Sequence, residues 1–289
     1  MAELLDCRAL AARYFDWVKK AKEELARKPA LATVLYTPAK NPASVQYRDL
    51  IHKDASKLGV GAKDFEAGTE EELLKLVDKL NRSPNINGVM VFYPLHAGLP
   101  DEDVMDRVSA RKDIEGLHSV NLGYLLKYKQ FLDPTRGIKC VVPATAKAVV
   151  KTLQAYPDIR LERSFVVIVN NSMRVGKPLG LMLENLGATV VKCYDKTRAE
   201  VMEDLVRRAD IVITAVPDPN FALEPAWIKK GAAVVDVSYQ GNIDVKALAH
   251  TASYVTAPDN RVGQVTRAMM FVNLIYCARN VRAKNLPVV

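Results

Sequence analysis

The sequence of 289 residues has few cysteines and no long apolar run. Its first segment, MAELLDCRALAARYF, has early acidic residues and no uninterrupted apolar core, so we expect no secretory signal peptide. The longest apolar run, residues 88–93, is too short to cross a bilayer, so no membrane span is predicted. The cysteines have neither metal-ligand nor redox-motif spacing; they are Cys7, Cys140, Cys193 and Cys277. We predict buried reduced thiols and a cytoplasmic protein.

Signatures of nucleic-acid, metal and hydrolase sites are also missing. The formal net charge is +8, but basic residues alternate with acidic ones, as on solvated helix faces. No Lys/Arg tract is interleaved with aromatic residues, so no nucleic-acid partner is predicted, and the excess charge can attract an anionic small molecule instead. No histidine pair has metal-ligand spacing, and no G-x-S-x-G elbow supports a Ser-His-Asp triad. We predict no metal and no covalent nucleophile.

Apolar strands and amphipathic helices alternate along the chain, without a fixed repeat. The first half predicts helices at 7–26, 44–58 and 70–80, and strands at 31–36 and 86–93. The second half predicts strands at 165–170, 188–194, 210–216 and 232–238, and helices at 175–186, 199–208, 225–230 and 265–280. Val and Ile dominate three of these four strands, as expected for strands buried on both faces. This order predicts an α/β fold with parallel sheets.

Two α/β domains with a cleft between them are expected, divided near residues 140–145. The first domain would comprise residues 1–142 and be completed by the C-terminal helical segment, residues 269–289. The second, residues 143–268, would be a Rossmann-like, doubly wound parallel sheet.

The segment VNNSMRVGKPLG, residues 169–180, leaves a buried strand and enters a helix with Pro178 in its first turn. Backbone N–H groups and the dipole at such a helix start favour a phosphate, to which Ser172 can add a hydroxyl and Arg174 a charge. The dinucleotide fingerprint G-x-G-x-x-G is absent. A phosphate-binding turn and an ordinary strand-to-helix turn are therefore both open interpretations.

Asp195 follows the next strand, 24 residues beyond Asn171. In a doubly wound nucleotide-binding fold, an acid roughly 20 residues beyond the phosphate loop bonds the adenosine ribose. Its carboxylate would repel a 2′-phosphate, so Asp195 favours NAD over NADP. The alternative is an ordinary turn aspartate, since Lys196 and Arg198 follow closely.

Two segments of the first half carry candidate substrate-binding residues. Tyr47 shares a helical face with Ser44 and Ile51, where its ring can stack on a flat ligand or simply pack with its hydroxyl at the rim. In ARKDIEGLHSVN, residues 110–121, Asp113 and Glu115 can accept hydrogen bonds from an aminopyrimidine. Asp113 can equally hold the loop together.

These segments, in order and over nearly the whole chain, resemble the methylenetetrahydrofolate dehydrogenase/cyclohydrolase family. The matching stretches are NPASVQY, NGVMVFYPL, KDIEGLHSVNLG, the turn at 143–145, NSMRVGKPLG, ADIVITAV and RVGQVTRAMMFVN. The resemblance implies two α/β domains, a C-terminal helix that returns to the first domain, and a homodimer.

The chain departs from the family's bifunctional pattern in the first half. Ile51 stands four residues after Tyr47, where bifunctional members have the lysine that activates the cyclohydrolase step. Lys53 points about 200° away from that position on a helix of about 3.6 residues per turn. Phe92 replaces a glutamine, and the pair of aspartates in the K-D-V-D-G motif becomes Asp113 and Glu115.

Departures in the second half concern the cofactor. Asn171 replaces the family's NADP-reading arginine, and a His-Ser pair becomes Tyr194 and Asp195. The whole pattern resembles the monofunctional, NAD-dependent branch of yeast type.

The resemblance implies oxidation of 5,10-methylenetetrahydrofolate to the methenyl form, with hydride passing to NAD and cyclohydrolase activity weak or absent. Tyr47 would be the catalytic residue, stacking on tetrahydrofolate. The other implied substrate-binding residues are Phe92, Pro94, Asp113 and Glu115, and the cofactor-binding residues are Asn171, Ser172, Arg174, Val175, Asp195, Val216, Val262, Gly263 and Thr266.

Two alternatives are open. One is a relative that keeps cyclohydrolase activity through Lys53 or Lys57, or that uses tetrahydromethanopterin. The other, from a different class, is a non-catalytic Rossmann-type binding protein. Loss of two residues that serve one half-reaction, beside a coherent change at the ribose position, favours a specialised enzyme.

Overall fold

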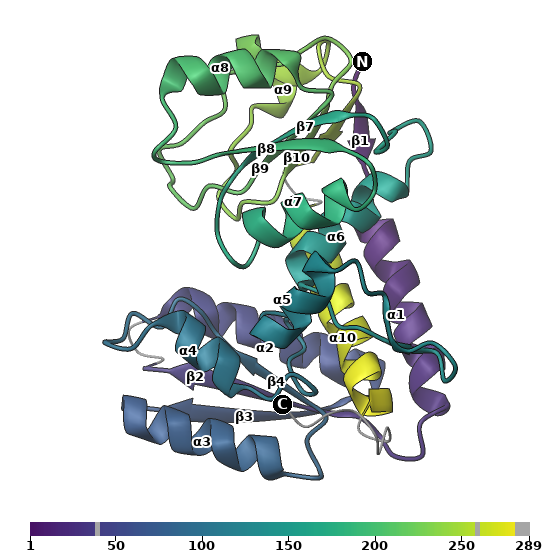
Figure 1. Cartoon of the computed structure of the whole chain (residues 1–289), viewed down its shortest axis with the longest axis vertical. Helices are drawn as coiled ribbons and strands as arrows, with labels where there is room; N and C mark the ends of the chain where they lie inside the picture. Colours follow the sequence, from purple (N-terminus) through teal and green to yellow (C-terminus); the bar gives the residue numbers. More distant parts are fainter. Residues whose placement is uncertain (38–40, 258–260, 281–289) are drawn as a thin grey trace. The chain divides into compact units, whose positions relative to one another are not determined.

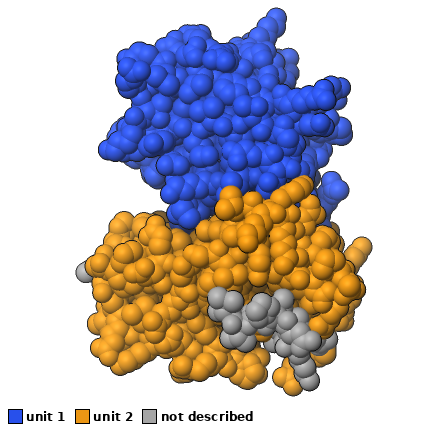
Figure 2. Space-filling view, in the orientation of Figure 1, with its two compact units in different colours: residues 1–13, 145–269 blue, residues 14–144, 270–289 orange. Residues whose placement is uncertain are grey.

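The computed structural model describes residues 1–37, 41–257 and 261–280. The chain forms two compact units (Figure 2). Unit 1 comprises residues 1–13 and 145–269, and unit 2 comprises residues 14–144 and 270–289. Each unit is an α/β structure around its own parallel sheet.

Unit 1 is built on a six-stranded sheet in the order β1-β11-β10-β9-β7-β8, and every neighbouring pair is parallel. The strands are β1 (Glu3–Leu5), β7 (Phe165–Val169), β8 (Thr189–Cys193), β9 (Ile211–Thr214), β10 (Ala233–Asp236) and β11 (Tyr254–Thr256). The chain passes from β7 to β8 on one side and then to β9 on the other. This reversal next to β7 is the mark of a doubly wound fold and confirms the predicted Rossmann-like sheet.

Helices alternate with these strands and cover the sheet (Figure 1). They are α6 (Ala144–Gln154), α7 (Gly176–Glu184), α8 (Ala199–Arg208) and α9 (Val245–Leu248), with one 3₁₀ turn, η2 (Pro225–Trp227). Val167, Val212 and Val234, from three adjacent strands, are fully buried in one apolar core. Such β-branched side chains favour strands and explain why the second half was predictable from its apolar runs.

Unit 2 is built on a three-stranded parallel sheet in the order β3-β2-β4. Its strands are β2 (Ala30–Tyr36), β3 (Gly61–Ala67) and β4 (Gly88–Val91). Its helices are α2 (Pro42–Leu58), α3 (Glu70–Arg82), α4 (Asp101–Arg107) and α5 (Ser119–Leu126), followed by the hairpin of β5 (Phe131–Asp133) and β6 (Ile138–Lys139).

The alternation of side chains along β2 divides unit 2 into two layers. Ala32 and Val34 face the core that includes Leu73 and Val77 of α3. Thr33, between them, points to the other face, where it bonds to a residue of α2. Helices α2 and α3 accordingly lie on opposite faces of the sheet (Figure 1).

Two long helices are shared between the units. Helix α1 (Cys7–Glu23) begins in unit 1 and continues into unit 2 after Arg13. Helix α10 (Gly263–Asn280) begins in unit 1 and belongs to unit 2 from Met270 onward. The predicted C-terminal segment, residues 269–289, therefore differs from the division of the structure by one residue at its start, and its residues 281–289 lie outside the described part.

The division of the N-terminal segment differs from the prediction that residues 1–142 form one domain. Residues 1–13 belong to unit 1, because β1 pairs with β11 and the backbone N–H of Asp6 donates to the Tyr156 hydroxyl at 2.6 Å. A strand of three residues leaves too little periodicity to be recognised. Strand β3 was missed because its sequence, GAKDFEA, is polar, as an edge strand can be. The helix predicted at 225–230 is only the 3₁₀ turn η2.

The four cysteines are free and buried, as predicted. Burial raises the pKa of the Cys7 and Cys140 thiols to about 11, so both are neutral near pH 7. None of the helices in the described part of the chain is both long and apolar enough to span a membrane.

Candidate active site

The turn between β7 and α7 is organised by Asn170, which sequence analysis did not single out. Its Oδ1 accepts hydrogen bonds from the Ser172 backbone N–H (2.9 Å), the Ser172 hydroxyl (2.8 Å) and the Gly176 N–H (2.9 Å). A Cβ at position 176 would lie 2.0 Å from the Asn170 carbonyl oxygen, so only glycine fits there. The turn thus has a defined shape, at the place where the sequence predicted a phosphate-binding turn.

The residues predicted to bind phosphate lie on this turn. The Ser172 hydroxyl is exposed and accepts from the Val175 N–H at 3.1 Å. Asn171 and Arg174 are half-buried, and Val175 is the residue preceding α7. The helix start and a cation are therefore combined on one turn, which suits a pyrophosphate.

Asp195 lies at the tip of the turn that follows β8. The turn is closed by the Thr197 N–H, which donates to the Tyr194 carbonyl at 2.8 Å, and by the Tyr194 N–H, which donates to the Thr197 hydroxyl at 3.0 Å. The Asp195 side chain is 75% exposed, and one carboxylate oxygen is 3.3 Å from Lys196 Nζ. Such an exposed pair is weak, so the carboxylate is available to a ligand hydroxyl.

The remaining cofactor candidates lie after β9 and at the start of α10. Val216 follows β9 and is half-buried. Val262 is buried, and its carbonyl accepts from the Thr266 N–H at 2.8 Å and the Thr266 hydroxyl at 3.2 Å. These bonds form the first turn of the helix that begins at Gly263. All the candidates belong to unit 1.

In unit 2, the residues of the KDIEG segment, residues 112–116, have different structural roles. Lys112 is buried, and its Nζ donates to the carbonyls of Leu80 (2.9 Å) and Ser83 (2.6 Å) at the end of α3. The ammonium group there donates to backbone carbonyls at the helix end that have no partner within the helix. Burial lowers the pKa of Lys112.

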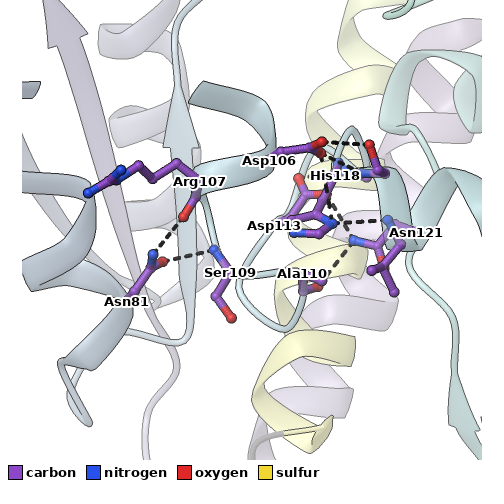
Figure 3. A network of polar contacts seen from close by, with 11 residues as sticks. Asn81, Asp106, Arg107, Ser109, Ala110, Asp113, His118 and Asn121 are labelled. Atoms are coloured by element: carbon purple, nitrogen blue, oxygen red, sulfur yellow. Dashed lines mark hydrogen bonds and ion pairs between the residues drawn. The ribbon is translucent and has the colours of Figure 1, made fainter. Parts of the chain in front are cut away.

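Asp113 holds the loop together. Its carboxylate accepts from the N–H groups of Gly116 and His118, both at 2.8 Å, and from Asn121 Nδ2 at 2.9 Å (Figure 3). Burial raises the pKa of Asp113, while these donors act in the opposite direction. Of the two roles open to Asp113 from the sequence, the contacts support the structural one.

Glu115 has a fixed backbone and a half-buried side chain. Its carbonyl accepts from the Ala144 N–H at 3.0 Å. The next residue, Gly116, has a φ of +74°, and a Cβ there would lie 2.4 Å from the Val142 carbonyl carbon. On the other side, Asn273 Nδ2 of α10 bridges the carbonyls of Ile114 (2.9 Å) and Val142 (3.0 Å).

Tyr47 packs among apolar groups of unit 2. Its ring meets that of Phe92 edge to face, with centroids 6.3 Å apart, and its hydroxyl lies 3.8 Å from Met270 Sδ. Ile51, one turn later on α2, is fully buried. Pro94, which follows a cis Tyr93–Pro94 bond, is exposed. Lys53 and Lys57 are also exposed.

One histidine of α2 belongs to a hydroxyl–carboxylate network that is not a nucleophilic triad. His52 Nε2 lies 2.8 Å from the Thr33 hydroxyl, which donates to Asp64 Oδ1 at 3.0 Å. Thr33 is fully buried, and its hydroxyl also lies 3.3 Å from the Lys63 carbonyl oxygen. Within residues 1–37, 41–257 and 261–280, no group of three or more His, Cys, Asp and Glu is placed to hold a metal ion.

Comparison with known proteins identifies the family. The catalytic-domain model of tetrahydrofolate dehydrogenase/cyclohydrolase matches residues 5–115, and its NAD(P)-binding-domain model matches residues 143–282. The bifunctional protein FolD of Leptospira interrogans is 31% identical over 287 residues, which cover 96% of each chain. The chain belongs to the tetrahydrofolate dehydrogenase/cyclohydrolase family.

Solved structures of this family have the same fold. The bifunctional methylenetetrahydrofolate dehydrogenase/cyclohydrolase FolD of Campylobacter jejuni superposes with a TM-score of 0.86 at 29% identity, covering 97% of this chain and 100% of that one. The NAD-dependent 5,10-methylenetetrahydrofolate dehydrogenase of Saccharomyces cerevisiae gives 0.88 at 23% identity, covering 99% of each chain. At that identity, the second match shows the fold alone.

The contacts of the KDIEG segment predict different effects for its two acids. Asp113→Ala leaves three donors in the loop without their acceptor and should lower the free energy of unfolding by about 3 kcal/mol. Glu115→Ala should lower it by less than about 1 kcal/mol, because its side chain is only half-buried. Urea unfolding of both variants measures the difference. Equal losses would contradict the division of roles within this family's motif.

Proposed function

We propose that the chain is an NAD-dependent 5,10-methylenetetrahydrofolate dehydrogenase in which the cyclohydrolase step is weak or absent. The observation that carries the proposal is Asp195, an exposed carboxylate at the end of the strand next to the phosphate turn. A carboxylate there accepts bonds from both ribose hydroxyls of NAD and repels the 2′-phosphate of NADP.

The residues of unit 1 fit a dinucleotide. Ser172, Arg174 and the start of α7 would bind the pyrophosphate, and Asn171 adds no cation for a 2′-phosphate. Val216, Val262, Gly263 and Thr266 would border the nicotinamide end. When bound, NAD supplies the hydride acceptor; the chain supplies binding and orientation.

The residues of unit 2 fit a pterin. The Tyr47 ring would stack on it, with Phe92 and Pro94 beside it, and the Glu115 carboxylate would accept from its aminopyrimidine N–H groups. Asp113 would act through the loop that carries Glu115. The methylene carbon lies between two nitrogens that stabilise the cation left when hydride departs, so the reaction requires positioning rather than acid–base catalysis.

Hydrolysis of the methenyl product makes a different demand. Water needs a positioned base, and the leaving nitrogen needs a proton. Ile51, where bifunctional members have lysine, is fully buried, and Phe92 offers no side-chain hydrogen bond. The two exposed lysines of α2, Lys53 and Lys57, do not share the face on which Ile51 is buried.

The proposal includes a cytoplasmic homodimer. The homodimer is supported by the family resemblance, and the cytoplasm by four free, buried cysteines.

Turnover with each cofactor tests the reaction. Purified protein is mixed with methylenetetrahydrofolate and either NAD or NADP, and the absorbance of the reduced cofactor and of methenyltetrahydrofolate is followed. We expect methenyl product to accumulate with NAD and little to form with NADP. Absence of turnover with both would favour another pterin or a Rossmann-type binding protein.

Asp195→Ser tests the choice of cofactor. Removing the carboxylate removes its repulsion of the 2′-phosphate, so the ratio of kcat/KM for NAD to that for NADP should fall at least about tenfold, equivalent to about 1.4 kcal/mol. Asp204→Ser is the control, since Asp204 is an exposed, ion-paired aspartate of α8 in the same unit. An unchanged ratio in Asp195→Ser would remove the role assigned to Asp195.

Methenyltetrahydrofolate hydrolysis tests the second half of the proposal. Because Ile51 and Phe92 supply neither base nor donor, decay of methenyl absorbance should proceed at about the uncatalysed rate. A bifunctional relative, assayed in parallel, is the positive control. Rapid hydrolysis that Lys53→Met or Lys57→Met abolishes would show that one of these lysines sustains the step.

A further inference from the structure

Two asparagines of unit 1 bond adjacent residues of one short segment, residues 215 and 216, just after β9. Asn170 follows β7, and its Nδ2 donates to the Ala215 carbonyl at 2.7 Å. Asn242 lies after β10 and is fully buried; its Oδ1 accepts from the Val216 N–H at 2.9 Å, and its Nδ2 donates to the Val216 carbonyl at 3.1 Å. The segment is therefore held from both sides by side chains from the two neighbouring strand ends.

Each asparagine also bonds a second segment. The Oδ1 of Asn170 accepts the three hydrogen bonds that shape the phosphate turn at Ser172 and Gly176. The backbone N–H of Asn242 donates to Asp236 Oδ2 at 2.6 Å, and Asp236 Oδ1 accepts from the N–H and hydroxyl of Ser238. A continuous series of hydrogen bonds thus runs from the phosphate turn, through residues 215–216, to the loop after β10.

The series crosses the place where the strand order reverses. Strands β7 and β9 are neighbours there, and doubly wound sheets bind their ligands beyond the carboxyl ends of such strands. Asp195 lies beyond β8, on one side of β7, and would take the adenosine half of a dinucleotide. The other half would then extend over β9 and β10, where Val216 and the Asn242 loop lie.

The side-chain amide is suited to this task, because it donates and accepts in one plane without a charge. That is how Asn242 bonds both the N–H and the carbonyl of Val216. At position 170, a neutral acceptor shapes the turn without adding a negative charge beside a pyrophosphate.

We propose that Asn170 and Asn242 are positioning residues that hold residues 215–216 as the wall shared by the two halves of the dinucleotide site. The proposal rests on the proposed cofactor binding. Asn170 shapes both the phosphate turn and this wall. Asn242 shapes the wall and the loop on the nicotinamide side, where it also bonds the Thr214 hydroxyl at 2.9 Å and the Phe221 carbonyl at 3.4 Å.

Calorimetric titration with NAD and with ADP separates these roles without measuring turnover. ADP represents the adenosine and pyrophosphate part alone. Asn242→Ala should weaken NAD binding about tenfold or more and change the Kd for ADP less than about twofold. Asn170→Ala should weaken both ligands about tenfold or more, because it removes the acceptor that shapes the phosphate turn.

Controls distinguish positioning from general damage to the fold. Gln154→Ala, which removes an exposed amide at the end of α6, should leave both Kd values unchanged. Because the two asparagines bond neighbouring residues, the losses of NAD affinity should be less than additive in the double variant. If Asn242→Ala does not fold, Asn242→Ser makes the same comparison, since it also removes the amide that bonds Val216 and adds no charge to the buried site.

Equal weakening of NAD and ADP by Asn242→Ala would overturn the proposal in favour of a purely structural role, and so would unchanged binding of both. Failure of the proposed cofactor choice gives a different result. A wild-type protein that binds NADP in preference to NAD would contradict that choice, and the same comparison made with NADP and ADP would still decide the role of the asparagines. A wild-type protein that binds neither dinucleotide would overturn both.

Discussion

Where parallel strands end, the following loop carries backbone N–H and carbonyl groups that no neighbouring strand can bond. In unit 1, the side chains of Asn170 and Asn242 bond those groups, and in unit 2 Asp113, which forms an isolated parallel bridge with Val89, does the same for its own loop. Each buried group left without a partner would cost about 1–3 kcal/mol. The shape of the loops that carry Ser172, Val216 and Glu115 depends on this constraint, and the candidate ligand contacts depend on that shape.

This dependence explains why a motif that identifies the family need not consist of ligand-binding residues. Within KDIEG, Lys112 completes the end of α3, Asp113 closes its own loop, and Ile114 is buried in the core. The side chain of Glu115, by contrast, is half-buried. In the turn between β7 and α7, likewise, Asn170 shapes the backbone, whereas the predicted cofactor contact was assigned to its neighbour Asn171. When two chains share such motifs, they share the fold of the site. The shared motifs say less about which cofactor or substrate the site binds.

The elements that could be predicted from the sequence are those whose conformation is determined by residues close together in the chain. Strands β7, β9 and β10 were recognisable because each contains a compact run of Val or Ile. Strand β1 was not, because it exists only through pairing with β11, about 250 residues later. Asn170 and Asn242 were missed for the same reason, since their partners come from other strand ends. A polar residue directly after a buried strand was the available signal for Asn170, but nothing local distinguishes Asn242 from an ordinary loop asparagine.

The pairing of buried polar groups does not by itself distinguish specialisation from decay at Ile51 and Asp195. Buried polar groups must be paired in a specialised and in a decayed site alike, because each unpaired group costs about 1–3 kcal/mol of stability whether or not a ligand binds. Among residues 1–37, 41–257 and 261–280, the single buried side-chain polar atom without a partner is Asn280 Oδ1, at the end of α10. No buried side-chain polar atom of the described loops at either candidate half-site lacks a partner, and Ile51 is fully buried. The paired groups therefore account for the stability of these loops, and the case for a specialised enzyme rests on the side chains at positions 51 and 195.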